Sequence, residues 1–150
     1  MSNFILTKEI ARLILLQRIQ LSGPLQKKIR KLFGRYLFTN FIAKFFINTN
    51  TISKKYYELM ISEFEIIKKY LDKKDQLYLS IGGGLGGLEL IINKNFKDKN
   101  YYFIEKNYIS KKIIYGWDIK NNEGYNNLKL LNFFLTNNGM NSSKINIFNF

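Results

Sequence analysis

Five glycines occupy the six positions 82–87, and this stretch constrains the fold more than any other part of the chain. Residues 76–81 before it form a short apolar run typical of a strand, and residues 88–92 after it are typical of the start of a helix. Glycine between a strand and a helix permits a tight turn and lets backbone N–H groups approach a ligand without an intervening Cβ. Such a ligand lies at the helix N-terminus, where unpaired N–H groups point outward. The stretch therefore predicts a binding loop rather than a simple surface turn.

A carboxylate follows this loop at the end of the next predicted strand, residues 100–105. It belongs to Glu105, which stands 23 residues after Gly82. In a right-handed β-α-β unit the carboxyl ends of the two strands are neighbours. A carboxylate at that point can accept hydrogen bonds from both hydroxyls of a ribose. Together, the glycines and the acid predict a pocket for an adenosine-type cofactor.

The remaining elements predict an α/β fold with helices ahead of the sheet. Apolar residues recur at helical spacing over residues 4–21 and 53–71, and a further helix is expected from Pro24 after the break at Ser22-Gly23. Residues 48–51 are expected to be a loop that contains capping residues. A helix over residues 124–138, ended by Asn138-Gly139, and a third strand over residues 144–149 complete the pattern. Strands that alternate with helices predict a doubly wound parallel sheet.

We therefore expect two regions, a basic helical region over residues 1–75 and the first half of a Rossmann-like sheet domain over residues 76–150. Residues 1–55 hold 11 Lys or Arg and one acid, whereas residues 56–150 hold 13 Lys or Arg and 10 acids. This excess of positive charge favours phosphates, anionic lipid headgroups or acidic glycans as partners. A genome rich in A and T would also enrich the chain in Lys, so the charge has a second explanation.

The composition excludes several kinds of site. The chain has no Cys and no His, which excludes disulfides, thiolate or imidazole metal sites, and catalytic triads built on either residue. No apolar run reaches the roughly 18 residues of a membrane span, and the N-terminus lacks the pattern of a signal peptide. We expect a cytoplasmic protein without a metal site, for which contact with a membrane surface stays possible.

Two cofactor classes fit the glycine loop. Gly82, Gly84 and Gly87 satisfy the G-x-G-x-x-G pattern of dinucleotide-binding domains, whereas Gly82, Gly84 and Gly86 satisfy G-x-G-x-G. Residues 79–87, LSIGGGLGG, resemble the first motif of class I S-adenosylmethionine-dependent methyltransferases. The helical segment before the first strand also favours that class, since many dinucleotide domains begin with the strand itself.

Residues 55–150 more particularly resemble a group of bacterial sugar O-methyltransferases associated with surface-polysaccharide synthesis. The matching stretches are Tyr56-Tyr57 and residues 104–106, 110–117 and 124–128. This resemblance implies S-adenosyl-L-methionine as the cofactor and a sugar hydroxyl of a glycan, or of its precursor, as the methyl acceptor.

The resemblance also implies roles for individual residues. Ser80, Gly82, Gly83, Gly84 and Gly86 would lie along the methionine and ribose of the cofactor, Glu105 would bind the ribose hydroxyls, and Asn149 would lie near the adenine. The family usually has Asp at the position of Ser80, where it helps to hold the methionine amino group; serine supplies a hydrogen bond but no charge.

Four further residues are candidates for the substrate side, because aromatic faces stack on sugar rings and amides bond hydroxyls. These candidates are Tyr115, Trp117, Tyr125 and Asn126. The alternative is that Tyr115 and Trp117 pack over the sheet and that Asn126 caps a helix.

The chain supplies only three of the seven strands that a complete class I domain contains. We expect a C-terminally truncated domain whose catalytic residues lie beyond Phe150, which is inactive and marginally stable alone, and whose third strand is an exposed edge. Three alternatives stay open: an RNA methyltransferase, favoured by the basic N-terminal third; an NAD(P)-dependent oxidoreductase; and a membrane-surface or partner-binding module.

Overall fold

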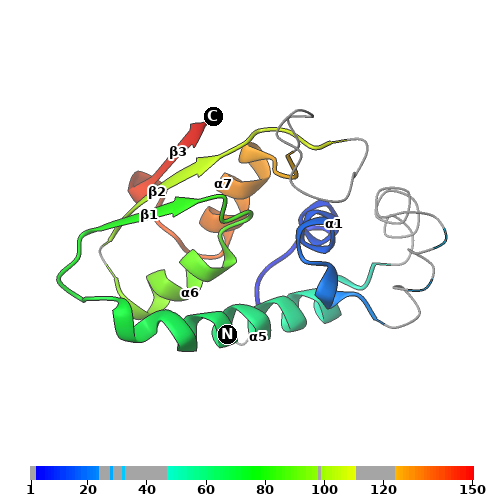
Figure 1. Ribbon diagram of the computed structural model, residues 1–150, viewed down its shortest axis with the longest axis horizontal. Coiled ribbons are helices and arrows are strands. Elements are labelled where there is room, and N and C mark those ends of the chain that lie inside the picture. Colours follow the sequence, from blue (N-terminus) through cyan, green and yellow to red (C-terminus); the bar gives the residue numbers. More distant parts are fainter. Residues whose placement is uncertain (1–2, 24–27, 29–31, 33–46, 98, 111–123) are drawn as a thin grey trace.

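The computed structural model describes residues 3–23, 28, 32, 47–97, 99–110 and 124–150. Its sheet has three parallel strands in the order β1-β2-β3, which are β1 (Leu77–Ile81), β2 (Asn100–Glu105) and β3 (Ile145–Asn149). The register pairs Ser80 with Phe103 and Glu105 with Asn149 (Figure 1). The predicted α/β class and the parallel sheet are confirmed, and each predicted strand agrees with the observed one to within one residue.

Four longer helices accompany the sheet among the described residues: α1 (Lys8–Gln17), α5 (Thr49–Ile67), α6 (Gly87–Asn95) and α7 (Leu128–Asn137). Short 3-10 turns follow α1 and α5 and precede β3; these are η1 (Ile19–Leu21), η3 (Lys68–Tyr70) and η5 (Ser142–Lys144). No helix in these parts of the chain is both long and apolar enough to cross a bilayer. The helix predicted from Pro24 lies almost wholly outside the described residues.

Capping side chains set helix starts that the sequence analysis placed wrongly. The Thr7 hydroxyl accepts a hydrogen bond from the Ile10 N–H at 3.2 Å, so α1 begins at residue 8 and not at residue 4. The Asn48 side chain accepts from the Thr51 N–H at 3.0 Å, which makes residues 49–51 helical instead of a loop. Asn127, not Asn126, caps α7, because its side chain accepts from the Leu130 N–H at 3.1 Å.

The predicted C-terminal end of α7 is confirmed. Gly139 follows the helix with a φ of 92°, in the left-handed region that Gly adopts without a steric penalty. The segment 124–127 before α7, which was expected to be helical, is extended: Tyr125 forms an isolated antiparallel bridge with Ile109.

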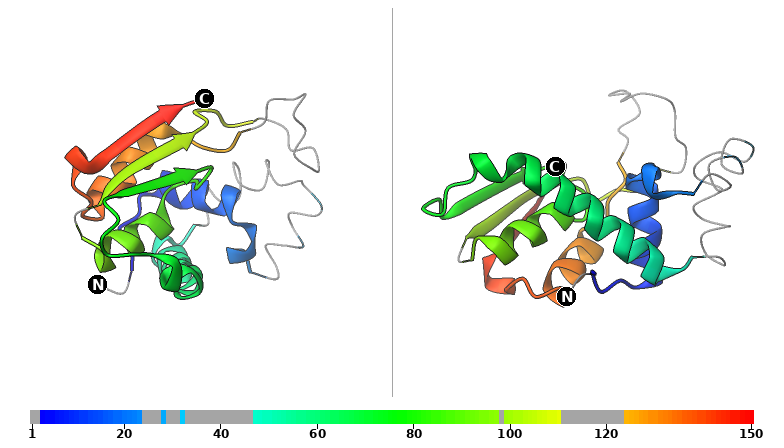
Figure 2. Two further views of the ribbon diagram at one scale, coloured as in Figure 1. Left: turned by 60° about the vertical axis from the view of Figure 1, so that its left-hand side comes forward. Right: turned by 90° about the horizontal axis from the view of Figure 1, so that it is seen from below.

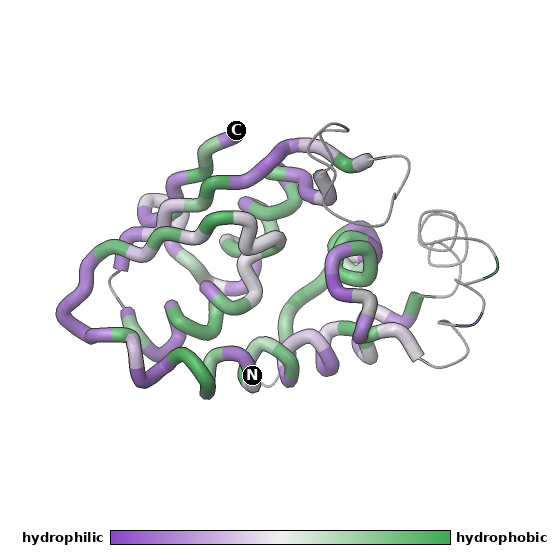
Figure 3. The backbone as a smooth tube through the Cα atoms, viewed as in Figure 1, coloured by the Kyte–Doolittle hydropathy of each residue, from purple (hydrophilic) through white to green (hydrophobic). Residues whose placement is uncertain are grey.

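One hydrophobic core joins the N-terminal helices to the sheet. Tyr101 and Phe103 of β2 are fully buried, and the Phe4 ring lies 5.5 Å from the Tyr56 ring of α5 and 5.3 Å from the Phe134 ring of α7. Hydrophobic and hydrophilic residues alternate along α5 (Figure 3), as expected of a helix that buries one face. This packing fixes α1 and the segment before it against the same core as the strands.

The helices gather on one face of the sheet (Figure 2). The other face exposes apolar side chains. The chain moves across the sheet in one direction, from β1 through α6 to β2 and from β2 through α7 to β3. Because such crossovers are right-handed, α6 and α7 lie on the same face of the sheet. Leu77, Leu79 and Ile81 of β1 are 63%, 58% and 68% exposed. Among the described strands, β3 is an edge with Phe148 exposed, as predicted, and β1 is a second and more apolar edge that was not predicted.

Candidate functional site

The glycine stretch forms the connection from β1 to α6. Gly82, Gly84 and Gly86 have φ values of 65°, 72° and 74°, a region that other residues rarely adopt. Gly86 is the N-cap residue of α6, so the first N–H groups of this helix lie next to the loop. Positive φ at alternate positions coincides with the G-x-G-x-G pattern rather than with G-x-G-x-x-G.

Glu105 lies against this loop, as the sequence predicted. Its Oε1 accepts a hydrogen bond from the Gly84 N–H at 2.7 Å, and the side chain is only 4% exposed. Burial raises the pKa of Glu105, and hydrogen bonds from Asn126 and from the backbone of Gly84 and Lys106 oppose part of that rise. The loop and the acid of the predicted cofactor pocket are therefore in direct contact.

Asn126 forms a hydrogen bond with the backbone of Gly84, as Glu105 does. Its Nδ2 donates to the Gly84 carbonyl at 2.7 Å, and its Oδ1 accepts from the Asn127 N–H at 2.9 Å. The side chain is buried against the loop. Asn126 was predicted to line the substrate side or to cap a helix; the structure instead groups it with the residues predicted to hold the cofactor.

Gln17, the last residue of α1, reaches the loop from the N-terminal region. A Cβ on Gly84 would lie 2.7 Å from Gln17 Oε1, so the absence of a side chain at Gly84 makes room for this amide. Gln17 Nε2 donates to the Tyr125 carbonyl at 2.7 Å. Gln17 was not predicted from the sequence, because a polar residue at the end of an amphipathic helix gives no signal of a long-range contact.

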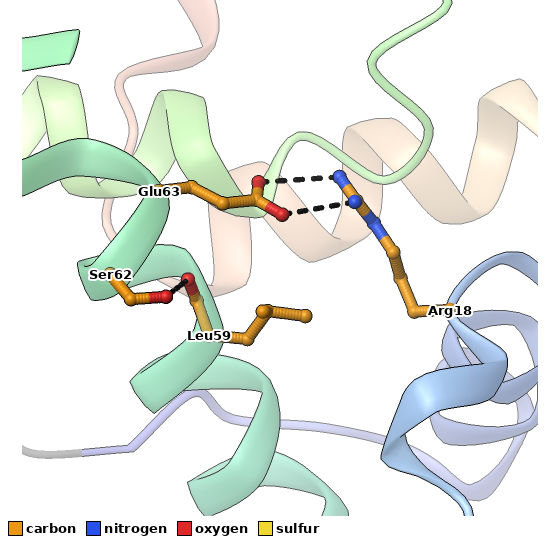
Figure 4. A network of polar contacts seen from close by, with 4 residues as sticks. All are labelled: Arg18, Leu59, Ser62 and Glu63. Carbon is orange, nitrogen blue, oxygen red and sulfur yellow. Dashed lines mark hydrogen bonds and ion pairs between the residues drawn. The ribbon is translucent and has the colours of Figure 1, made fainter. Parts of the chain in front are cut away.

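The ion pair that follows Gln17 holds the end of α1 against α5. The guanidinium of Arg18 donates to both carboxylate oxygens of Glu63, at 3.0 and 3.4 Å (Figure 4). In the same view the Ser62 hydroxyl donates to the Leu59 carbonyl within α5, at 2.7 Å. The Arg18 and Glu63 side chains are 34% and 28% exposed, so the pair contributes up to about 1 kcal/mol and acts chiefly to orient α1.

Ser80 and Glu89 form a buried pair beneath the loop. The Ser80 hydroxyl donates to Glu89 Oε1 at 2.5 Å, and the two residues are 6% and 3% exposed. A Cβ on Gly83 would lie 2.9 Å from the same Oε1, so the loop backbone passes directly over the pair. Burial raises the pKa of Glu89, and the hydrogen bond from Ser80 partly opposes the rise. The sequence analysis missed Glu89, whose signal was a carboxylate inside the otherwise apolar run 88–92.

The other predicted residues occupy different places. Asn149 lies beside Glu105 in the sheet, is exposed, and accepts a hydrogen bond from the Asn107 N–H at 2.8 Å. Tyr125 is half-buried in the segment that precedes α7. Tyr115 and Trp117 lie outside the described residues, so their predicted role in substrate binding stays a prediction.

Comparisons with protein-family models, with curated proteins and with solved structures found no match. The residues that the fold brings together at the glycine loop are therefore the indication of function.

Proposed function

We propose that the sheet is part of a Rossmann-like domain that binds S-adenosyl-L-methionine on the glycine loop and serves methyl transfer. The observation that carries the proposal is the contact between Glu105 and the Gly84 N–H at 2.7 Å, in a loop whose alternate glycines have positive φ and lead into α6. This contact joins an acceptor for ribose hydroxyls to a backbone that can approach a ligand closely.

The chain's residues fit such a ligand at three points. An ionised carboxylate has about four acceptor positions, and the Gly84 N–H uses one of those on Glu105, so acceptors remain for a ribose diol. The N–H groups at the start of α6 suit the carboxylate of an amino acid. Asn149 is exposed at the end of the neighbouring strand, where an adenine ring can lie. When bound, the cofactor supplies a methyl group on a positively charged sulfur, and the chain's own residues bind and orient it.

The sugar acceptor is the finer part of the proposal, and it depends on the resemblance over residues 110–117 and 124–128. The contact between Gln17 and the Tyr125 carbonyl supports it, because it brings the second of these segments next to the loop. A hydroxyl that attacks the methyl group must be held in line with the carbon–sulfur bond, and Tyr125 lies in the segment that Gln17 connects to the loop.

Calorimetric titration of the chain with S-adenosylhomocysteine tests the cofactor. We expect one binding site, and we expect Glu105→Ala to weaken binding about ten- to hundred-fold, since it removes charge-assisted hydrogen bonds worth about 1.5–3 kcal/mol. Glu58→Ala is the matched control, because Glu58 is an exposed glutamate on α5. Absence of binding by the unmodified chain, or equal binding by Glu105→Ala, would refute the proposal.

A nicotinamide-dependent oxidoreductase is the second candidate, and one observation favours it. A Cβ on Gly87 would lie 2.5 Å from the Tyr56 hydroxyl, so α6 packs closely on α5 at this residue. In the dinucleotide pattern the third glycine allows close packing of the helix on the strand. At Gly87 the close neighbour is on helix α5, so the likeness is limited to the need for a residue without a side chain. Titration with NAD in place of S-adenosylhomocysteine separates the two candidates, and binding of NAD alone would favour the oxidoreductase.

The partner of the basic N-terminal region stays a prediction. Five of the 11 basic residues within residues 1–55 lie outside the described part of the chain, namely Lys27, Arg30, Lys31, Arg35 and Lys44. RNA binding that weakens steeply with rising salt would support an RNA methyltransferase. Binding to anionic vesicles would support the membrane-surface alternative.

A further inference from the structure

The face of the sheet that is turned away from the helices, called the open face below, is largely apolar. Side chains alternate along a strand, so every second residue of each strand lies on this face. Its apolar residues are Leu77, Leu79 and Ile81 of β1, Tyr102 and Ile104 of β2, and Phe148 of β3. Two amides, Asn100 and Asn146, lie near the amino ends of β2 and β3 on the same face. The apolar surface therefore runs from β1 to the carboxyl ends of the other two strands.

The area of this surface is large for a chain of this size. The residues of β1 and Phe148 are each more than half exposed, and Tyr102 and Ile104 are half-buried. At roughly 200 Å² for a fully exposed large side chain, the six residues present about 500–600 Å² to water. The largest apolar patch on a typical monomer is about 300–600 Å², and patches of that size often mark an interaction site. The open face is at the upper end of that range.

The open face is also free of charge. None of its eight residues is charged, although 23% of the chain is charged and its net charge is +13. An uncharged face offers nothing to an acidic partner or to anionic headgroups. Around a two-fold axis the same patch meets itself, so any charge on it would lie near its like. The absence of charge removes that penalty, and the face is suited to pack on a second copy of itself.

The shape of the open face suits the same partner. The rings of Tyr102 and Phe148 lie stacked, with centroids 6.3 Å apart and planes inclined by 5°. The described helices lie on the opposite face, so they leave the approach to the open face clear (Figure 2). Two sheets that pack face to face lie about 10 Å apart, with side chains of the two inner faces interdigitating.

We propose that two copies of the chain pack their open faces together, sheet on sheet, in a dimer with two-fold symmetry. The two faces would bury about 1,000–1,200 Å² in total, which is at the lower end of specific interfaces. We expect a dissociation constant of about 10–100 μM, so dilute solutions contain the monomer. This inference does not depend on the proposed cofactor, because the open face lies outside the contacts of the glycine loop.

Sedimentation equilibrium of the full chain tests the proposal. Over concentrations from about 1 to about 300 μM, which bracket that constant, the average mass should rise from 17.8 kDa towards twice that value. Two variants place a lysine on the open face at its opposite edges, Leu79→Lys on β1 and Phe148→Lys on β3. Each should weaken the dimer about ten-fold or more, because it buries an unpaired ammonium group next to its like.

Ile66→Lys is the matched control, because Ile66 is 69% exposed on α5, away from the open face. It adds the same charge and should change the dissociation constant by less than about two-fold. Far-ultraviolet circular dichroism shows whether each variant folds. All three substituted side chains are exposed, so the fold of the monomer should be retained.

Each possible result either supports or overturns the dimer. A chain that stays monomeric at the highest concentration overturns it, and so do species larger than a dimer. Equal weakening by Ile66→Lys would show only general repulsion between basic chains, and would also overturn it. Weakening by Leu79→Lys but not by Phe148→Lys would indicate pairing of β1 edges instead of packing of the faces. If one variant does not fold, the other variant and the mass of the unmodified chain decide.

Discussion

Replacing Gly86 with Ala should destabilise the protein more than the same replacement at Gly82. Both residues have positive φ, 74° and 65°, so Ala is strained by about 1–2 kcal/mol at either position. Their surroundings differ. A Cβ on Gly86 would lie 2.9 Å from Leu135 Cδ2 and 3.2 Å from Phe103 Cε1, whereas nothing lies within 4 Å of a Cβ on Gly82. Overpacking of a core costs a further 1–3 kcal/mol or so. We therefore expect losses of about 2–5 kcal/mol for Gly86→Ala and about 1–2 kcal/mol for Gly82→Ala.

Urea unfolding followed by far-ultraviolet circular dichroism measures the difference. The free energy of unfolding falls by about 1–3 kcal/mol per molar urea for small proteins. A difference of about 2 kcal/mol between the two variants therefore separates their midpoints by about 1 M when the slope is near 2. Because both variants carry the same kind of backbone strain, the difference between their midpoints measures the steric conflict of the new methyl group with Leu135 and Phe103. Equal midpoints, or a lower midpoint for Gly82→Ala, would contradict this reasoning.

Two further predictions concern the buried polar groups. Burial raises the pKa of Glu89 and Glu105 above the usual 4.5, so the folded protein binds these protons more tightly than the unfolded chain does, and stability is lost as the pH rises through the native pKa values. Glu89→Gln removes one such titrating group, so its urea midpoint should fall less than that of the unmodified protein as the pH rises above 4.5; parallel slopes would count against the buried acid. Asn126→Ala leaves the Gly84 carbonyl without its side-chain donor and should cost about 1–3 kcal/mol in urea unfolding. The control Asn95→Ala, at an exposed helical amide, should cost less than about 1 kcal/mol, and similar losses in both variants would show that the contact with Gly84 adds nothing.

The strands and the contact between Glu105 and the glycine loop could be predicted from the sequence, because they depend on local pattern and on one topological rule. Each strand is a short, largely apolar run, and polar or glycine residues bound β1 and β2 on both sides. The position of Glu105 beside the loop follows from the right-handed connection between neighbouring parallel strands. Neither conclusion needs the packing of distant side chains, and both agree with the structure.

The helix starts could not be predicted to the residue, because several neighbours are equally good caps. Asn48, Thr49, Asn50 and Thr51 all have side chains that can accept from a backbone N–H, and only the observed bond to the Thr51 N–H selects Asn48. Residues 126 and 127 are both Asn, which created the same ambiguity at α7.

The contacts of Gln17 and Glu89 were missed for a different reason. Gln17 reaches Gly84 only because α1 packs on the same core as the strands, and an amphipathic pattern gives the buried face of a helix but not its neighbour. Glu89 lies among apolar residues on the buried side of α6, where a carboxylate is rare. Its position was visible in the sequence, but its partner Ser80 became evident only when β1 and α6 were placed together.

The uncovered face of the sheet affects how stability varies with temperature. The heat capacity change of unfolding comes largely from apolar surface that first meets water when the chain unfolds, about 0.45 cal/mol/K for each Å². Leu77, Leu79, Ile81 and Phe148 already meet water in the native state and add little to it. An ordinary domain of this length has a heat capacity change of about 1.8–2.3 kcal/mol/K. We expect a value below that range for this chain. Its free energy of unfolding should then change less steeply with temperature, and cooling should lower it less than in a protein whose sheet is covered on both faces.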